Sequence, residues 1–427
     1  MYGRIPGSYQ RRSMTPMRRN TQFAAIVALL ICLCGSARAD IVQQIAALVP
    51  ERPHSYAQMY AKLASLARSD RVSLVSLGCS SLGRDVLCVA VHDPATVFGQ
   101  TPRLFVIGRQ HGNEPSGTEA ALAFVQHFAT TQGELERETL KRLTIVAVPM
   151  ANPDGAEKGR RRNGNNVDLN RDWLGQTQPE VKAIETAVRV WRPNALMDLH
   201  DLPRSAPRPS YRENFVETIG DAAGIPAFVS SHTLPAAADI ARWLHGYGHR
   251  ANVYYDGPGK DRSLCHRHFG LDRAIPSFLF EAKTGPGRTL RHRASFHALG
   301  MLVVANHLLH TTPTGTTTDG LQMVQTPSTP GPRASTGPAR VGLQFGTTQS
   351  GMELSANVQG GDVRYVKFYL NGHLSVITNT EPYVCRLSAE DHGTGRHQVR
   401  ADVIGLDGKV LARAHETVEI DHKALGE

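Results

Sequence analysis

Two histidines and a glutamate each follow an apolar, strand-like run, and this placement constrains the fold and chemistry of the chain more than any other feature. Residues 104–108 lead into a His-Gly-Asn-Glu motif that contains His111 and Glu114, and residues 195–199 lead directly into His200. In open α/β sheets, ligands gather at the carboxyl ends of strands. Two imidazoles and one carboxylate form the protein ligand set of a catalytic zinc site, which leaves a fourth position for water. The sequence therefore predicts one zinc ion bound by these three residues.

Strand-like runs alternate with segments of helical periodicity through most of the chain. We expect strands at residues 72–77, 86–91, 104–108, 143–149, 195–199 and 277–280, and helices at 56–67, 117–128, 179–191 and 294–310. Residues 152–155 are expected to form a turn. This alternation predicts the α/β fold class, with a mostly parallel mixed sheet and helices on both faces.

The composition changes twice after residue 310. Residues 311–340 are rich in Thr, Pro, Gly and Ser, which indicates a linker. Residues 341–427 hold short alternating segments with hairpin turns at Asn371-Gly372 and Asp407-Gly408, so we expect an all-β sandwich of about 80 residues. Residues 366–372 and 381–383 resemble bacterial immunoglobulin-like modules. Polysaccharide binding, packing against the first domain and a spacer role stay open, with a structural role as the default.

The first 39 residues have the pattern of an export signal. Arg18 and Arg19 precede an apolar stretch at residues 23–33, and Ala37-Arg38-Ala39 offers a cleavage site. A retained anchor helix is the alternative, although the apolar core is short for a membrane span. Cleavage would leave residues 40–310 as the catalytic domain and place the protein in the periplasm or outside the cell, without a stable membrane anchor.

The basic charge belongs mostly to this leader. Residues 1–39 contain six arginines and no acidic residue, so 41 of the 47 basic residues would face 38 acidic ones and the net charge would fall from +9 to +3. The charge therefore does not point to a nucleic-acid partner. Cys79 and Cys88 flank a predicted hairpin. They form either a cross-strand disulfide, which export permits, or two small buried apolar side chains.

Further catalytic candidates lie on a later strand and in a basic loop. Hydrolysis needs a base to take a proton from water and return it to the leaving group, and Glu281 ends an apolar run. Capping the strand or pairing with Lys283 is the alternative for this carboxylate. In the loop at residues 158–173, Arg171 is suited to clamp a substrate carboxylate, Arg161 to face an oxyanion and Asp168 to orient a ligand histidine. The alternative for the whole loop is a solvated basic segment.

The ordered motifs at residues 111–114, 152–155, 168–171, 199–200 and 281 resemble the zinc carboxypeptidases of the carboxypeptidase A/D superfamily. The resemblance covers about residues 56–310. It implies that one zinc ion is bound by His111, Glu114 and His200, and that Glu281 is the general base.

The same resemblance assigns the basic loop. It implies that Asn170 and Arg171 bind the terminal carboxylate of a peptide substrate, and that Asp168 orients the first zinc histidine. The arginine that polarises the scissile carbonyl falls on Arg161, although the run of three arginines at residues 160–162 allows a shift of one position.

Two features depart from the family pattern. The family places a mobile tyrosine in a Gly-Ser-rich loop some twenty-odd residues before the catalytic glutamate. Here the nearest choices are Tyr254 and Tyr255, and their spacing to Glu281 is slightly long. The following loop contains Cys265, His266 and His268, where His-x-His forms either a second metal site or, as is more common, a structural or solvated pair.

The sequence thus predicts an exported zinc metallocarboxypeptidase that hydrolyses an amide bond next to a C-terminal carboxylate. An amidase acting on peptidoglycan stem peptides and a deacylase of N-acyl amino acids are the enzymatic alternatives. The complete motifs at residues 152–155 and 168–171 favour the peptidase. A non-catalytic surface binding protein is disfavoured because the ligands, the base and an oxyanion donor are all present.

Overall fold

The computed structural model describes residues 41–96, 99–205, 213–311, 338–348, 351–378, 383–387, 393–405 and 409–420. The proposed export signal, most of the linker and the predicted turn at residues 406–408 lie outside these ranges. Within them, no helix combines the length and apolar character needed to cross a membrane.

The first part of the chain is an α/β unit, as the sequence predicts. Its strands are β1 (Val72–Cys79), β2 (Asp85–Val91), β3 (Arg103–Gly108), β4 (Thr144–Val148), β5 (Ala195–Leu202), β6 (Asn214–Ile219), β7 (Ala251–Asp256) and β8 (Ser277–Lys283). The helices are α2 (Tyr56–Leu66), α3 (Ser116–Thr130), α4 (Glu134–Arg142), α5 (Pro153–Glu157), α6 (Pro179–Trp191), α7 (Ala227–Gly246), α8 (Cys265–Arg267) and α9 (Leu290–Thr311), with short helical turns at Leu169–Arg171 and His268–Asp272.

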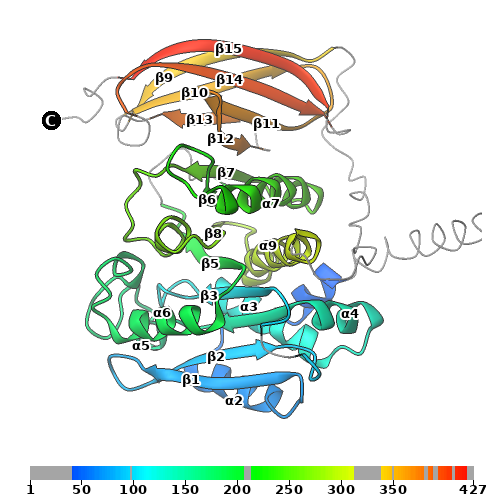
Figure 1. Ribbon diagram of the computed structural model, residues 1–427, viewed down its shortest axis with the longest axis vertical. Helices are drawn as coiled ribbons and strands as arrows, with labels where there is room; N and C mark the ends of the chain where they lie inside the picture. The colour runs from blue at the N-terminus through cyan, green and yellow to red at the C-terminus, as the bar shows by residue number, and fades with distance from the viewer. Residues whose placement is uncertain are drawn as a thin grey trace, which may run out of the picture.

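The strand order of this unit is β1-β2-β4-β3-β5-β8-β6-β7. The centre is parallel, with β3 between β4 and β5 and with β8 next to β5, whereas β1, β2 and the β6–β8 pair are antiparallel. One apolar core packs against α3, α7 and α9 and a second against α6, so both faces of the sheet are covered (Figure 1).

The C-terminal part is a two-sheet β-sandwich. One sheet has the order β13-β10-β9, formed by β13 (Tyr383–Leu387), β10 (Gly351–Gln359) and β9 (Arg340–Thr348). The other contains β12 (His373–Thr378), β11 (Val363–Leu370), β14 (Gly395–Gly405) and β15 (Val410–Ile420). Apolar side chains of both sheets meet in a common core. Because β12 pairs with β7, this second sheet continues the sheet of the α/β unit (Figure 1).

Four local expectations need correction. Both strands that carry site residues are longer than predicted, so His200 and Glu281 lie within β5 and β8 rather than after them. Residues 153–157 form a short helix, α5, because Asn152 caps its first turn by accepting from the Gly155 backbone N–H at 2.8 Å. The alternative of a Cys79–Cys88 disulfide is wrong, because Cys79 pairs in register with Asp85 and Cys88 with Val75, and both thiols are free. The alternative of two buried side chains holds for Cys88, whereas Cys79 is exposed.

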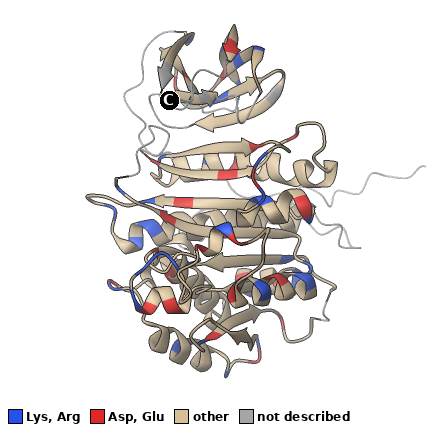
Figure 2. Cartoon of the chain, turned by 90° about the vertical axis from the view of Figure 1, so that its left-hand side faces the viewer, with Lys and Arg blue, Asp and Glu red and all other residues tan. Residues whose placement is uncertain are grey.

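Acidic and basic residues are spread over the whole molecule, in keeping with the nearly balanced charge that remains without the leader (Figure 2). Acidic positions interrupt the central strands themselves, notably Asp198 in β5, Glu217 in β6 and Glu281 in β8. Carboxylates on strands that are otherwise apolar and buried need a chemical explanation, because a charge is costly to bury unless it is paired. They gather around the candidate site.

Candidate metal centre and active site

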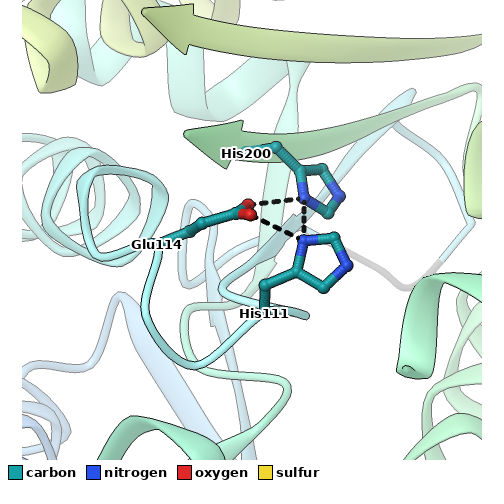
Figure 3. Close-up of side chains that lie close together, drawn as sticks. All are labelled: His111, Glu114 and His200. Atoms are coloured by element: carbon teal, nitrogen blue, oxygen red, sulfur yellow. Dashed lines mark hydrogen bonds and ion pairs between the residues drawn. The ribbon is translucent and has the colours of Figure 1, made fainter. Parts of the chain in front are cut away.

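Three side chains converge at the carboxyl ends of β3 and β5. His111 Nδ1 lies 2.9 Å from Glu114 Oε1, and His200 Nδ1 lies 2.9 Å from Glu114 Oε2. The two Nδ1 atoms are 3.0 Å apart, and all three residues are buried. Figure 3 shows Glu114 and His111 reaching from the loop after β3 toward His200 on the neighbouring strand. The structure therefore brings together the three predicted ligands.

The hydrogen bonds behind the rings show that this donor set fits zinc. His111 Nε2 lies 3.0 Å from Asp168 Oδ1, and His200 Nε2 lies 2.9 Å from Asp198 Oδ1. Carboxylate partners favour a proton on each Nε2, which leaves both Nδ1 lone pairs directed at the same point. In a tetrahedral zinc site, bonds of about 2.0 Å place two nitrogen ligands about 3.3 Å apart, close to the spacing here. These residues would hold zinc.

The loop that carries His111 is shaped by close backbone packing. Arg109 adopts a φ of 57°, and its Nε donates to the Gly112 carbonyl at 2.9 Å. A Cβ on Gly112 would lie 2.0 Å from the backbone carbon of Gly155, so only glycine fits there. Asn152 Nδ2 donates to the Arg161 carbonyl at 3.1 Å. The motif at residues 152–155 thus fixes the loops that carry His111 and Arg161.

Arg161 lies beside the ligands, and its neighbours in the arginine run do not. Its Nη1 donates to Glu114 Oε1 at 3.2 Å and its Nε to Asp168 Oδ2 at 3.0 Å. Arg162 instead donates to the Asn166 carbonyl. Burial opposes ionisation of Asp168, but hydrogen bonding to His111 and the charges of His111 and Arg161 outweigh it and hold the pKa of Asp168 below its usual range. Of these two arginines, Arg161 is therefore the one that contacts the predicted ligand Glu114 and its neighbour Asp168.

Glu281 faces the same region without a fixed partner. It pairs in register with His200 on adjacent parallel strands, and no hydrogen bond or ion pair to its carboxylate is found among the described residues. Lys283, the alternative partner, donates to the Pro203 carbonyl at 2.8 Å. Burial raises the pKa of Glu281 well above its usual value; His200 opposes this shift, and nearby carboxylates, Glu114 foremost, add to it. A carboxylate that takes up a proton this readily has the property a general base needs.

A cavity of about 610 Å³ opens in front of these groups and is lined by His111, Arg161, Asn170, Arg171 and Glu281, among others. Arg171 is exposed, and its Nη1 donates to the Asn170 carbonyl at 2.8 Å. The Asn170 side chain is buried, and its Oδ1 accepts from the Cys265 backbone N–H at 2.8 Å. Of this pair, Arg171 is the residue with a charged group at the cavity.

The His-x-His pair does not share a ligand. His266 Nε2 contacts Asp256 Oδ2 at 2.8 Å, whereas His268 Nε2 contacts Glu185 Oε2 at 3.1 Å. His266 also lies near a second cluster of potential ligands with Asp256 and Glu217. Arg267 occupies that cluster, with its Nε 2.8 Å from Asp256 Oδ2. A side-chain cation already supplies the positive charge there.

Register distinguishes the two tyrosines. Tyr254 pairs with Glu217, and Glu217 pairs with Leu279, two residues before Glu281, so Tyr254 shares the sheet face of Glu281. Tyr255 alternates to the opposite face, where it packs against the large apolar core. Burial raises the pKa of its phenol well above the usual value.

Sequence reasoning assigned no role to Asp198, although a signal was available. Residues two apart on a strand point to the same face, so Asp198 had to lie on the face of His200. Besides His200 Nε2, Asp198 Oδ1 accepts from Gln110 Nε2 at 2.6 Å, and Gln110 Oε1 accepts from Trp173 Nε1 at 2.7 Å. This buried series of hydrogen bonds fixes the orientation of the His200 ring.

Replacing Asp198 by asparagine is expected to weaken zinc binding by about 10- to 100-fold, because partners behind ligand histidines typically contribute that much. The measurement is the zinc dissociation constant in competition with a chelator. Asp70→Asn, at an exposed position, is the matched control. An unchanged affinity in Asp198→Asn would show that Asp198 does not support the ligand.

Comparison with known proteins confirms the resemblance drawn from the motifs. Residues 58–195 match the family model described as zinc carboxypeptidase. Carboxypeptidase SOL1 of Arabidopsis thaliana is 32% identical over 146 residues, which are 31% of this chain and 30% of that protein. Carboxypeptidase D of Mus musculus is 34% identical over 137 residues, covering 28% of this chain and 10% of that protein. The chain thus spans less than a third of the length of these curated relatives.

A solved structure shows the same fold. The metallo-carboxypeptidase from Burkholderia cenocepacia aligns with a TM-score of 0.50 and 21% identity, over 60% of this chain and 70% of that one. The predicted α/β class is therefore confirmed. The match to the zinc carboxypeptidase model and the His-Glu-His cluster agree with the predicted zinc cofactor. The C-terminal part is a β-sandwich, but its immunoglobulin-like character stays a prediction.

Proposed function

We propose that this protein is a zinc metallocarboxypeptidase that hydrolyses the amide bond next to a free C-terminal carboxylate. One observation carries the proposal: His111 of the His-Glu-His set, the Arg171 guanidinium and the Glu281 carboxylate, which has no hydrogen-bond partner among the described residues, all line one cavity. A hydrolytic site needs a bound electrophile, a base and an anchor for the substrate, and these groups can supply each function.

The side chains divide the work of hydrolysis. When bound, zinc supplies a Lewis acid that makes hydroxide available from water near neutral pH. Glu281 takes the proton from the attacking water and returns it to the departing amine. Arg161, held by Glu114 and Asp168, donates to the oxygen that becomes negative in the tetrahedral intermediate. Arg171 holds the substrate carboxylate, for which its planar guanidinium is suited.

The test compares matched peptides on the purified protein. The protein is expected to release the last residue from peptides with a free C-terminal carboxylate. Release from the corresponding C-terminal amides should be at least tenfold slower. A chelator should stop the reaction, and added zinc should restore it. Mass spectrometry of the products gives the cleaved bond. Cleavage of muropeptides or N-acyl amino acids in preference to every peptide would replace the proposal by one of the two alternative activities.

We also propose that the protein acts in the periplasm or outside the cell. The pattern of charged residues, apolar stretch and small-residue cleavage site at residues 1–39 supports this placement. Mass spectrometry of the N-terminus of the exported protein tests it, with Asp40 expected as the first residue. Recovery of a chain with its leader intact, in the membrane fraction, would instead favour the retained anchor.

A further inference from the structure

We infer that the C-terminal β-sandwich is part of the substrate site, where β12 and the β11–β12 turn limit the size of the C-terminal side chain that the substrate can have. This inference rests on the proposed carboxypeptidase function. It gives the sandwich a part in substrate selection rather than the role of a spacer.

The sandwich is joined to the catalytic unit by main-chain pairing. Val376, Ile377 and Thr378 of β12 pair antiparallel with Tyr254, Val253 and Asn252 of β7, so one sheet crosses the boundary (Figure 1). Thr378 Oγ1 donates to Asn252 Oδ1 at 2.5 Å, and both residues are buried. Pairing at a sheet edge fixes the register and the distance between the two parts.

Side-chain packing makes this junction rigid. Ile377 of β12 is fully buried in the same apolar cluster as Val253 of β7, and Tyr365 and Ile404 of the sandwich join that cluster. On the other face, Tyr254 contacts the sandwich core and the ring of Phe215, with ring centroids 5.9 Å apart. A close-packed junction of this kind does not deform easily. Parts of the sandwich that reach the cavity are therefore held in place.

The cavity extends from His111 and Glu281 to the sandwich. Because β12 runs antiparallel to β7, the β11–β12 turn lies beside the carboxyl end of β7, where Asp256 and Gly257 border the cavity. Five sandwich residues complete that side: Leu370, Asn371, Leu374, Ser375 and Val376. Part of the cavity wall is thus built from a segment about 90 residues beyond the last catalytic candidate, Glu281.

The turn that forms this wall has a fixed shape. Asn371 and Gly372 have φ angles of 50° and 86°, as expected of the two-residue hairpin turn that the sequence predicts. Asn371 Oδ1 accepts from the Gln398 backbone N–H at 2.9 Å, and the Asn371 N–H donates to the Gln398 carbonyl at 2.8 Å. The neighbouring strand β14 therefore anchors the turn before any substrate binds.

The proposed roles of Arg171 and Glu281 place the substrate in this cavity. With the terminal carboxylate at Arg171 and the scissile bond at Glu281, the last residue lies between these two groups. Its side chain then extends into the rest of the cavity, which Tyr254 and the sandwich wall bound. Leu374 lines the cavity and is half-buried, with its side chain also packed against the large apolar core, so a change in its size alters this part of the cavity wall.

The test changes the size of Leu374 in both directions in the full chain. Rates are measured as kcat/KM on blocked dipeptides ending in alanine, leucine, phenylalanine or lysine. The quantity compared is kcat/KM on each peptide divided by kcat/KM on the alanine peptide. For the peptides with the largest side chains, Leu374→Ala is expected to raise this ratio at least tenfold and Leu374→Trp to lower it at least tenfold. A single methylene in an apolar pocket changes selectivity by about 10- to 200-fold.

Matched controls separate this effect from a loss of folding. Leu411 lies on β15 and is 38% exposed, away from the residues that line the cavity, so Leu411→Ala and Leu411→Trp should keep the wild-type ratios. Thermal unfolding and zinc content are measured on every variant, and Leu374→Ala decides the question if the tryptophan variant does not fold. Wild-type ratios in a folded Leu374→Ala would overturn the inference. A wild-type protein that cleaves none of the peptides would instead overturn the proposed function.

Discussion

Glu281→Gln is expected to lower kcat by about 10²–10⁴-fold while zinc stays bound, the range that a positioned acid–base group contributes. Glutamine keeps the size of the side chain and its place on β8, but it cannot accept the proton of the attacking water. The wild-type carboxylate has no fixed partner among the described residues, so the substitution breaks no hydrogen bond that the structure shows. The measurement is kcat on a cleaved peptide together with zinc content.

A glutamate far from the cavity serves as the control for this substitution. Glu138 lies on α4 with its side chain 52% exposed and pairs with Lys141, so Glu138→Gln should keep wild-type kcat and stability. If Glu281→Gln retains kcat within tenfold of wild type, Glu281 is not the base. If its activity falls only because zinc is lost, the residue supports the metal centre instead.

The three candidate metal ligands could be picked out in the sequence because each follows a strongly apolar run. A fully buried strand is recognisable in sequence, and the residues at its carboxyl end then have a known position in an α/β sheet. The strands proved longer than expected because His200 and Glu281 are polar and appear in the sequence to end an apolar run. Main-chain pairing between β5 and β8 nevertheless continues past both residues to Leu202 and Lys283.

The region between β5 and β8 was not predicted, and its sequence shows why. Helix α7 contains Pro235, a residue that usually ends or kinks a helix, and many of its buried positions are alanine. Strand β6 mixes Asn214, Glu217 and Thr218 with apolar residues. These polar residues are explained by tertiary contacts: Thr218, for example, donates to the Ser277 carbonyl of the neighbouring strand at 2.8 Å.

The pairing of the sandwich with the catalytic sheet is the feature of the fold that local sequence patterns could not predict. Alternation identifies β12 as a strand, but the pairing of residues 376–378 with residues 252–254 joins segments more than 100 positions apart. An unpaired edge strand offers free N–H and C=O groups to any partner. Which edge of the catalytic sheet receives β12 depends on the packing of Ile377 and Tyr254, and not on the pattern of either strand alone.

Arg161→Ala is expected to lower kcat by about 10²–10³-fold, the usual effect of removing one oxyanion donor. Such a donor acts on charge that develops during the reaction, so kcat and kcat/KM should fall together and KM should change little. The same substitution removes the hydrogen bonds to Asp168 and Glu114. Zinc content and the zinc dissociation constant are therefore measured beside the steady-state rates.

The neighbouring arginines supply matched controls, since both carry the same charge in the same loop. Arg162 donates to the Asn166 carbonyl and Arg160 is exposed, so Arg160→Ala and Arg162→Ala should retain kcat within a few-fold of wild type. A large loss in Arg162→Ala with an active Arg161→Ala would move the oxyanion donor by one position. If Arg161→Ala lost zinc and regained full turnover when zinc was added in excess, Arg161 would act by holding Asp168 and Glu114 in place, and the oxyanion would need another donor.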